Sequence, residues 1–102
     1  MFSELARLHI NKAVMEETEN AVKNYGETYN SPHEGYAVLL EEVEEAADDL
    51  TYIKNNLGVL LQSIKTNDLD ATTLTDIEGT AQLLALEAVQ IAAVCSKFKK
   101  GL

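Results

Sequence analysis

Apolar residues recur at alternating spacings of three and four along the middle of the chain. Counted with Tyr36 at heptad position a, the series is Tyr36, Leu39, Val43, Ala46, Leu50, Ile53, Leu57, Leu60 and Ile64. Such a heptad spacing is typical of a long helix whose apolar stripe packs against a neighbouring helix. Gly58 lies inside the series without disturbing its register, at a cost of about 1 kcal/mol relative to alanine. We therefore predict one continuous helix over residues 32–65.

A second stripe of the same kind follows a polar connection at residues 66–72. Counted with Leu74 at position a, its members are Leu74, Ile77, Ala81, Leu84, Ala88, Ile91, Cys95 and Phe98. The stripe predicts a helix over residues 73–99, with Thr75 and Glu78 as one candidate capping box at its start. Residues 3–25 carry an imperfect apolar face, which predicts another helix.

Cap residues mark the helix boundaries. Gly26 is placed to end the first helix, and Ser31-Pro32-His33-Glu34 combines an N-cap serine, a proline at the first helical position and a glutamate three residues after the cap. The fold class is therefore all-α, an up-down helical bundle of three main helices in a single domain of residues 1–102. Because two matched stripes are hard for so short a chain to cover alone, we expect oligomerisation to complete the bundle.

Composition restricts the partners. The net charge is −9, and only eight Lys and Arg are present. We expect no nucleic acid partner, because phosphate backbones are bound by basic side chains. The single Cys95 excludes an internal disulfide and makes an intracellular location the default. With no apolar run of membrane-spanning length and no signal-peptide pattern, we expect a cytoplasmic protein without a membrane partner.

One carboxylate stands in an apolar segment. Glu87 is the only charged residue between Ala81 and Cys95. Burying a lone carboxylate is costly unless a cation or a hydrogen-bond donor meets it. Residues 41–45 offer further carboxylates that would repel Glu87 in a packed bundle. A Mg²⁺ ion shared between the two segments would resolve both problems, so we predict a magnesium site.

The heptad register brings the acidic residues to equivalent edges of the two helices. Glu42 and Glu87 fall at position g, while Glu45 and Gln90 fall at position c. Side chains three apart share a helix face, so an antiparallel crossing can bring the two pairs together. Asp49 continues the g line one heptad beyond Glu42.

Other candidate residues receive ordinary structural roles. Glu44 falls at position b, and Asp48 and Glu41 fall at position f, and both positions are typical of a solvated helix face. Glu34 serves as a capping residue, and His33 in the first turn is expected to be an exposed neutral imidazole. Cys95 lies on the apolar stripe and is expected to pack there. Zinc motifs, phosphate-binding glycine loops and dinucleotide fingerprints are absent from the sequence.

Two acidic stretches of the chain resemble the signature of a known family. Residues 41–45, Glu-Glu-Val-Glu-Glu, followed by residues 87–90, Glu-Ala-Val-Gln, resemble the EExxE…ExxD signature of the MazG-like, all-α nucleoside triphosphate pyrophosphohydrolases. Residues 33–42 and 89–95 are similar to a subgroup of small MazG-like proteins of bacteria and their prophages. The resemblance implies hydrolysis of a (d)NTP to the monophosphate and pyrophosphate, in dimers or dimers of dimers.

The resemblance also assigns roles to residues. It implies that Glu42, Glu45 and Glu87 are metal ligands for Mg²⁺, with Mn²⁺ as a substitute, and that Glu41 is an auxiliary acidic residue of the catalytic site. The metal would neutralise phosphate charge and lower the pKa of an attacking water, and a carboxylate could take its proton.

One position departs from the signature. Gln90 stands where the family has aspartate, and a neutral amide is a poorer Mg²⁺ ligand that leaves the site one charge short. Asp49 is the candidate that would compensate as a further ligand. The alternative is a non-catalytic helical scaffold or regulatory protein that keeps the fold; Gln90 favours this alternative, and the three retained glutamates favour the enzyme.

Overall fold

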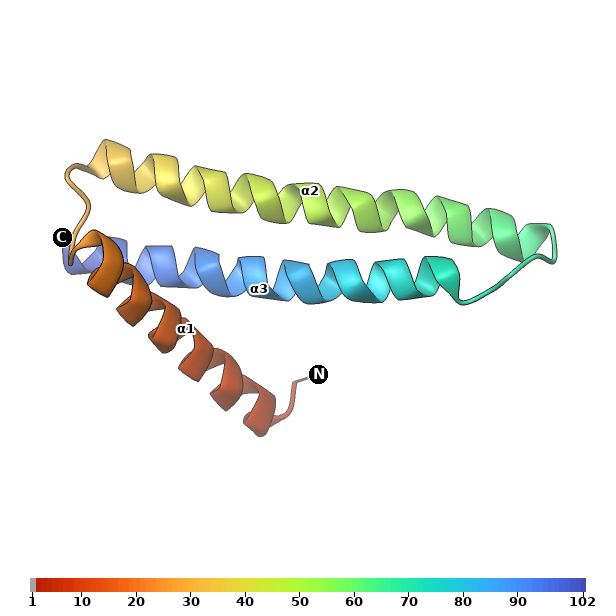
Figure 1. Cartoon of the computed structure of the whole chain (residues 1–102), viewed down its shortest axis with the longest axis horizontal. Coiled ribbons are helices and arrows are strands. Elements are labelled where there is room, and N and C mark those ends of the chain that lie inside the picture. Colours follow the sequence, from red (N-terminus) through yellow and green to blue (C-terminus); the bar gives the residue numbers. More distant parts are fainter. Residues whose placement is uncertain (1) are drawn as a thin grey trace.

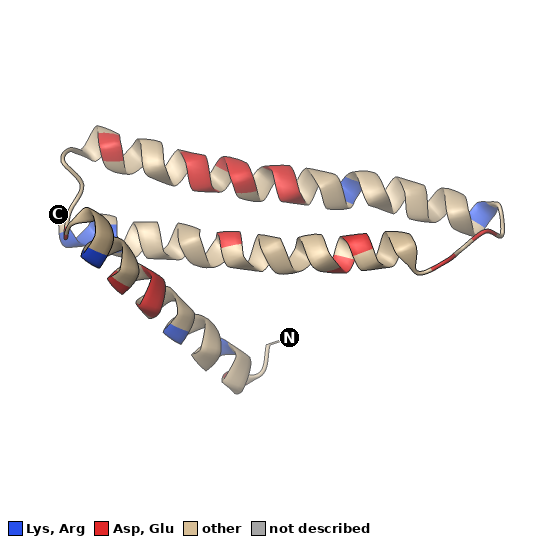
Figure 2. Cartoon of the chain, viewed as in Figure 1, with Lys and Arg blue, Asp and Glu red and all other residues tan. Residues whose placement is uncertain are grey.

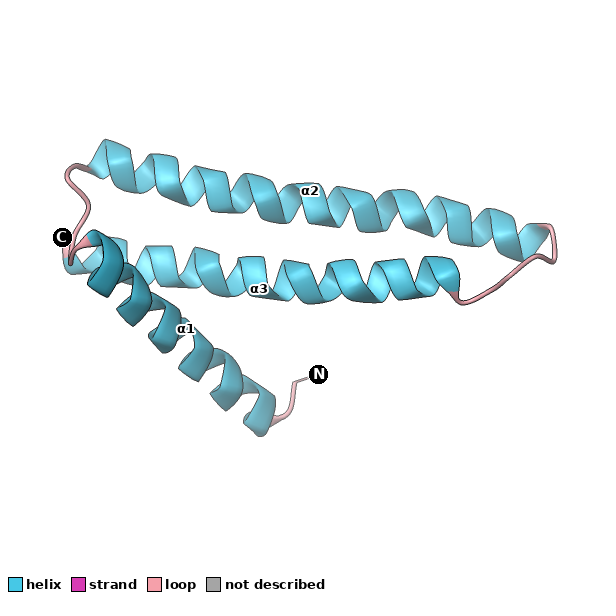
Figure 3. Cartoon of the chain, in the orientation of Figure 1, coloured by secondary structure: helices cyan, strands magenta, loops and turns pink. Residues whose placement is uncertain are grey.

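The computed structural model describes residues 2–102, which form three α helices and no strand (Figures 1 and 3). Helix α1 spans Glu4–Tyr25, α2 spans Pro32–Lys65 and α3 spans Thr72–Lys100. The all-α prediction is confirmed, and each predicted helix end lies within one residue of the observed one. Helix α2 passes through Gly58 without interruption, as the unbroken heptad spacing predicts.

Side-chain caps explain where α1 and α2 begin. The Ser3 hydroxyl accepts a hydrogen bond from the Ala6 N–H at 3.1 Å, and the Ser31 hydroxyl accepts one from the Glu34 N–H at 3.1 Å. The Glu34 carboxylate in turn accepts bonds from the backbone N–H and the side-chain amide of Asn30. These bonds satisfy N–H groups that have no partner inside the helix, and they confirm the predicted start of α2.

The start of α3 differs from the prediction. The helix begins at Thr72, whose N–H donates to the Asp70 carboxylate at 2.9 Å. The predicted capping box of Thr75 and Glu78 is wrong, because the Thr75 N–H already bonds the Ala71 carbonyl within the first helical turn. Asp70 precedes Thr75 in the chain and bonds the N–H of Thr72, so the helix has already started when the chain reaches Thr75.

Gly26 ends α1 as predicted. Its φ of 94° lies in the left-handed region that side chains disfavour, and its N–H donates to the Val22 carbonyl at 2.9 Å. The chain reverses there, and α2 then runs antiparallel to α3 along most of their length (Figure 1). Helix α1 crosses α3 obliquely, and within residues 2–102 it packs against α3 alone.

The heptad stripe splits into a covered line and an open line. The d positions of both helices are half-buried: Leu39, Ala46, Ile53 and Leu60 in α2, with Ile77, Leu84, Ile91 and Phe98 in α3. The a positions of α2 are all exposed: Tyr36, Val43, Leu50, Leu57 and Ile64. We call these two sets line d and line a. The g positions of α2 are half-buried like line d, so Glu42 and Asp49 on line g face the interface between α2 and α3.

The described chain is extended rather than compact. Its radius of gyration is 17.4 Å, against about 13 Å for a compact domain of this length. The buried residues gather around the crossing of α1 with the C-terminal half of α3, and they are Thr18, Gly35, Ala93, Val94 and Lys97. The rest of the long α2–α3 pair therefore keeps apolar surface open to solvent.

Helix α3 is unusually apolar. By length and composition it could cross a membrane, since it contains an 18-residue window with a mean hydropathy of 1.3. One such helix is weak evidence of a membrane span, because the core helix of a soluble protein can meet the same criteria. The absence of a membrane partner stays a prediction.

Candidate metal centre

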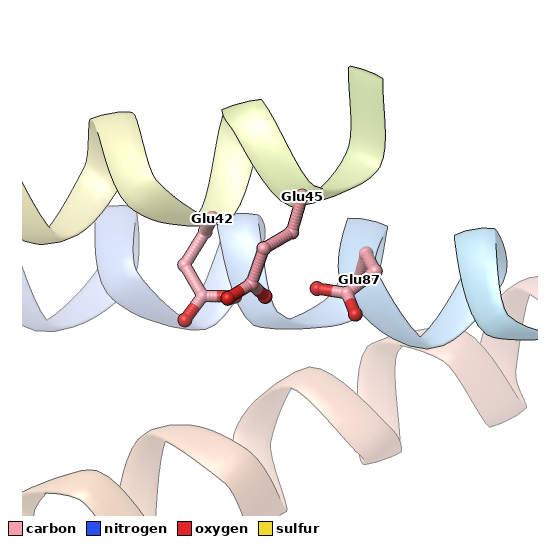
Figure 4. Close-up of side chains that lie close together, drawn as sticks. All are labelled: Glu42, Glu45 and Glu87. Atoms are coloured by element: carbon pink, nitrogen blue, oxygen red, sulfur yellow. The ribbon is translucent and has the colours of Figure 1, made fainter. Parts of the chain in front are cut away.

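Three carboxylates converge where α2 passes α3 (Figure 4). Glu42 and Glu45 come from α2 and Glu87 from α3, and one oxygen of each lies within 4.8 Å of the others. Glu42 and Glu87 are half-buried, whereas Glu45 is exposed, so the cluster opens to solvent. Positions g and c of α2 and position g of α3 border the contact between the helices, which explains the convergence.

The carboxylates repel one another. Partial burial raises the pKa of Glu87, and a hydrogen bond with Glu45 and the negative charges of Glu45, Glu42 and Asp49 raise it further. Partial burial also raises the pKa of Glu42, with smaller contributions from the charges of Glu45 and Glu41. Each of these causes penalises the ionised form, so the cluster is electrostatically strained at neutral pH.

No basic side chain relieves this strain. The only ion pair within residues 2–102 joins Lys12 and Glu16 at 3.9 Å on the exposed surface of α1. Figure 2 shows acidic residues in the N-terminal half of α2 and across from it on α3, while basic residues lie on α1, in the C-terminal half of α2 and at the C-terminal end of α3. A divalent cation would replace the repulsion by attraction, and carboxylate oxygens are the hard ligands that Mg²⁺ prefers. The residues present therefore fit such an ion.

Gln90 is engaged elsewhere. Its side-chain amide donates a hydrogen bond of 2.8 Å to the Glu17 carboxylate, which links α3 to α1. Gln90, a predicted metal ligand, is therefore bonded to α1 and is not one of the three residues of the cluster. Glu17 is a site residue that the sequence reasoning missed. Its only signal was the polar middle of the first helix, which no motif covers.

The remaining predicted residues surround the cluster. Asp49 is half-buried on line g and close enough for its charge to raise the pKa of Glu87, although it lies outside the group of three. Glu41 is exposed beside the cluster. Glu44 and Asp48 are exposed and lie outside the group, in agreement with their predicted place on a solvated face.

A groove adjoins the cluster. It lies between α1 and α2 with α3 as its floor, and it encloses about 420 Å³. Its walls include Tyr25 and Tyr29, then Glu42 of the cluster, with Gln90 and Lys97 from α3. A polar recess that shares Glu42 and Gln90 extends it along α1. This size suits a small organic ligand, and the carboxylates stand at its edge.

Comparisons with known protein families, with curated proteins and with solved structures found no match to this chain. The fold and the site together define a class: an all-helical protein in which two antiparallel helices present three converging carboxylates to a groove.

Proposed function

We propose that the chain is a Mg²⁺-dependent nucleoside triphosphate pyrophosphohydrolase of the MazG-like type, which converts a (d)NTP to the monophosphate and pyrophosphate. The observation that carries the proposal is the convergence of Glu42, Glu45 and Glu87 from two helices at the edge of a groove. The resemblance of residues 41–45 and 87–90 to the family signature gives the reaction class.

The roles of the residues follow from their positions. Glu42, Glu45 and Glu87 would hold Mg²⁺ or Mn²⁺, which when bound neutralises phosphate charge and lowers the pKa of a water molecule. Glu41 is exposed beside these ligands and is the proposed acceptor of the water's proton. Asp49 supplies negative charge on the neighbouring turn, in place of the aspartate that Gln90 replaces.

We further propose that the chain works as a homodimer or a dimer of dimers in the cytoplasm, without a nucleic acid or membrane partner. The exposed line a of α2 supports the assembly, because a second copy could cover apolar residues that this chain leaves open. Leu57 is 53% exposed and Tyr36 is 64% exposed. The extended shape of the chain also supports assembly, because it leaves the long α2–α3 pair without cover on one side.

The enzyme proposal is tested by screening the common NTPs and dNTPs for pyrophosphate release with Mg²⁺ or Mn²⁺. We expect release with at least one nucleotide, its loss in EDTA, and a fall of about 100-fold or more in Glu87→Gln, since a metal ligand is removed. Glu44→Gln is the matched control and should keep full activity. Release that survives Glu87→Gln would contradict the proposed site.

A second candidate is a non-catalytic helical scaffold or regulatory protein. The hydrogen bond from Gln90 to Glu17 favours it, because the side chain at the family's aspartate position joins two helices instead of approaching the cluster. In this case no nucleotide should release pyrophosphate, and Mg²⁺ at millimolar concentration should leave the melting temperature unchanged. A rise in melting temperature that depends on Glu87 would favour the enzyme.

A further inference from the structure

Lys97 is a buried lysine without a carboxylate partner. It lies on α3 and is only 2% exposed. Within residues 2–102, no carboxylate oxygen lies within 4.0 Å of its ammonium nitrogen. Lysine is seldom buried unless its charge is paired, and this chain offers 17 acidic residues for pairing. Packing alone therefore does not account for the position of this ammonium group.

The ring of Tyr29 covers the charge. The Lys97 nitrogen lies 4.3 Å from the centre of this ring, which gives a cation–π contact, and the ring itself packs edge-on against Phe98 at 5.7 Å. Burial raises the pKa of Tyr29, and the charges of Glu34 and Glu42 raise it further, so the tyrosine stands near the acidic residues of α2. The Tyr29 ring covers one side of the ammonium and leaves it without a negatively charged partner.

The ammonium opens into the groove rather than into a sealed pocket. Lys97 lines the groove together with Glu42 and Gln90. Within residues 2–102 there is no fully buried side-chain nitrogen or oxygen that lacks a hydrogen-bond partner. The Lys97 nitrogen has no hydrogen-bond partner, so it keeps some exposed surface, and Lys97 is one of the residues that line the groove. The groove thus has Lys97 in one wall and Glu34, Glu41 and Glu42 of α2 in another, and Glu42 belongs to the carboxylate cluster.

This pairing of opposite charges suits a ligand with several phosphate groups. One phosphate would meet the metal ion at the cluster, and another would supply the negative charge that Lys97 lacks. Three donors on a flexible stem allow a lysine ammonium to bind phosphate as a point charge.

We propose that Lys97 is a phosphate-binding residue, which holds the polyphosphate of a nucleotide or pyrophosphate in the groove while the metal at Glu42, Glu45 and Glu87 holds its other end. The inference rests on the proposed function for the identity of this ligand. It adds a residue outside both acidic motifs, on a different face of α3 from Glu87, and it assigns Tyr29 as the positioning residue of the ammonium.

The test is calorimetric binding of inorganic pyrophosphate in the presence of Mg²⁺, with Mg²⁺ alone as a separate titration. Lys97→Met should weaken pyrophosphate binding by about tenfold or more, because a charge-assisted contact is lost, while Mg²⁺ alone binds as in the wild type. Lys97→Arg should retain most of the affinity. Lys100→Met, which removes an exposed lysine from the same helix end, should bind like the wild type.

A second measurement on the wild type protects the test against misfolding of Lys97→Met. In NMR spectra of protein with isotope-labelled lysine side chains, Mg²⁺ and pyrophosphate should shift the Lys97 resonance and leave that of Lys100 in place. Unchanged affinity in folded Lys97→Met, or an unmoved Lys97 resonance at saturation, would overturn the inference. If hydrolysis depends on Glu87 but not on Lys97, the inference fails alone. If pyrophosphate binds through Lys97 but no nucleotide is cleaved, the proposed enzyme fails and the phosphate site stands.

Discussion

The raised pKa values of Glu42 and Glu87 link the stability of the metal-free protein to pH. Burial and neighbouring carboxylates make both side chains bind protons more tightly in the folded state than in the unfolded chain, where the usual value is 4.5. The folded state therefore holds more protons at a pH between the unfolded and folded pKa values. Stability must fall as the pH rises through this window, and it is greatest at its acidic end.

Glu87→Gln should accordingly stabilise the metal-free protein at neutral pH, because it removes one of the repelling charges. Thermal melts in EDTA should show a higher melting temperature than the wild type and a weaker decline of stability with rising pH. Excess Mg²⁺ should reverse the order, since only the wild type keeps all three ligands. Glu44→Gln is the control and should match the wild type. A metal-free wild type whose stability does not fall above the usual carboxyl range would contradict this account.

Gly35 is required for close packing against Phe98. A Cβ atom at this position would lie 2.5 Å from ring atom Cε2 of Phe98, which is closer than real contacts allow. The ring would have to move away from its edge contact with Tyr29. Gly35→Ala should therefore lower the free energy of unfolding by about 1–3 kcal/mol, measured by urea denaturation. Wild-type stability in this variant would show that the Phe98 ring shifts without cost.

At the scale of the elements, the continuity of α2 depends on its tolerance of Gly58 in the C-terminal third of the helix. A Cβ atom at Gly58 would meet nothing within 4 Å. Gly58→Ala should raise the free energy of unfolding by about 1 kcal/mol, because alanine loses less backbone entropy on entering a helix. The same urea experiment should show a lower free energy of unfolding for Gly35→Ala, so each variant serves as a control for the other. Destabilisation by Gly58→Ala would indicate that another chain covers this face.

Gln90 affects the docking of α1 on α3. Gln90→Asp removes the donor to Glu17 and places two carboxylates opposite each other, so without metal it should weaken the protein by about 1–2 kcal/mol. Hydrogen exchange should then be faster in α1 than in α2. If the cluster binds Mg²⁺, the added carboxylate should tighten that binding and Mg²⁺ should restore protection. Gln82→Asp is the control, because this glutamine is exposed on α3. Failure of Mg²⁺ to rescue Gln90→Asp would favour the scaffold.

At the scale of the whole molecule, the exposed line a of α2 predicts association. Covering a leucine side chain contributes about 1.5–3 kcal/mol, so Leu57→Glu on this line should dissociate the assembly. Light scattering at micromolar concentration should give at least a dimer for the wild type and a smaller species for the variant. Asn55→Glu adds the same charge at a neighbouring exposed position and should leave the assembly intact. A monodisperse wild-type monomer would contradict the prediction.

Helix type, length and ends could be predicted from the sequence because they depend on neighbours within a few turns. The spacing of apolar residues predicts α2 through Gly58, and Ser31 and Gly26 mark ends by local hydrogen bonds and backbone geometry. The cap of α3 is the exception, because Asp70 and Thr75 are both acceptable local caps and the sequence does not decide between them. The clustering of Glu42, Glu45 and Glu87 could also be predicted from the sequence, because heptad position g lies at the border of the contact between two packed helices.

The tertiary structure alone decided how each helix is rotated and what it meets. An apolar stripe is wider than the strip that one neighbouring helix covers. The spacing alone therefore could not show that lines d and g of α2 are covered while line a stays exposed. The bond of Gln90 with Glu17 and the contact of Lys97 with Tyr29 join residues far apart in the chain. Such pairs depend on the crossing of α1 over α3, which is set by packing among all three helices and by no local signal.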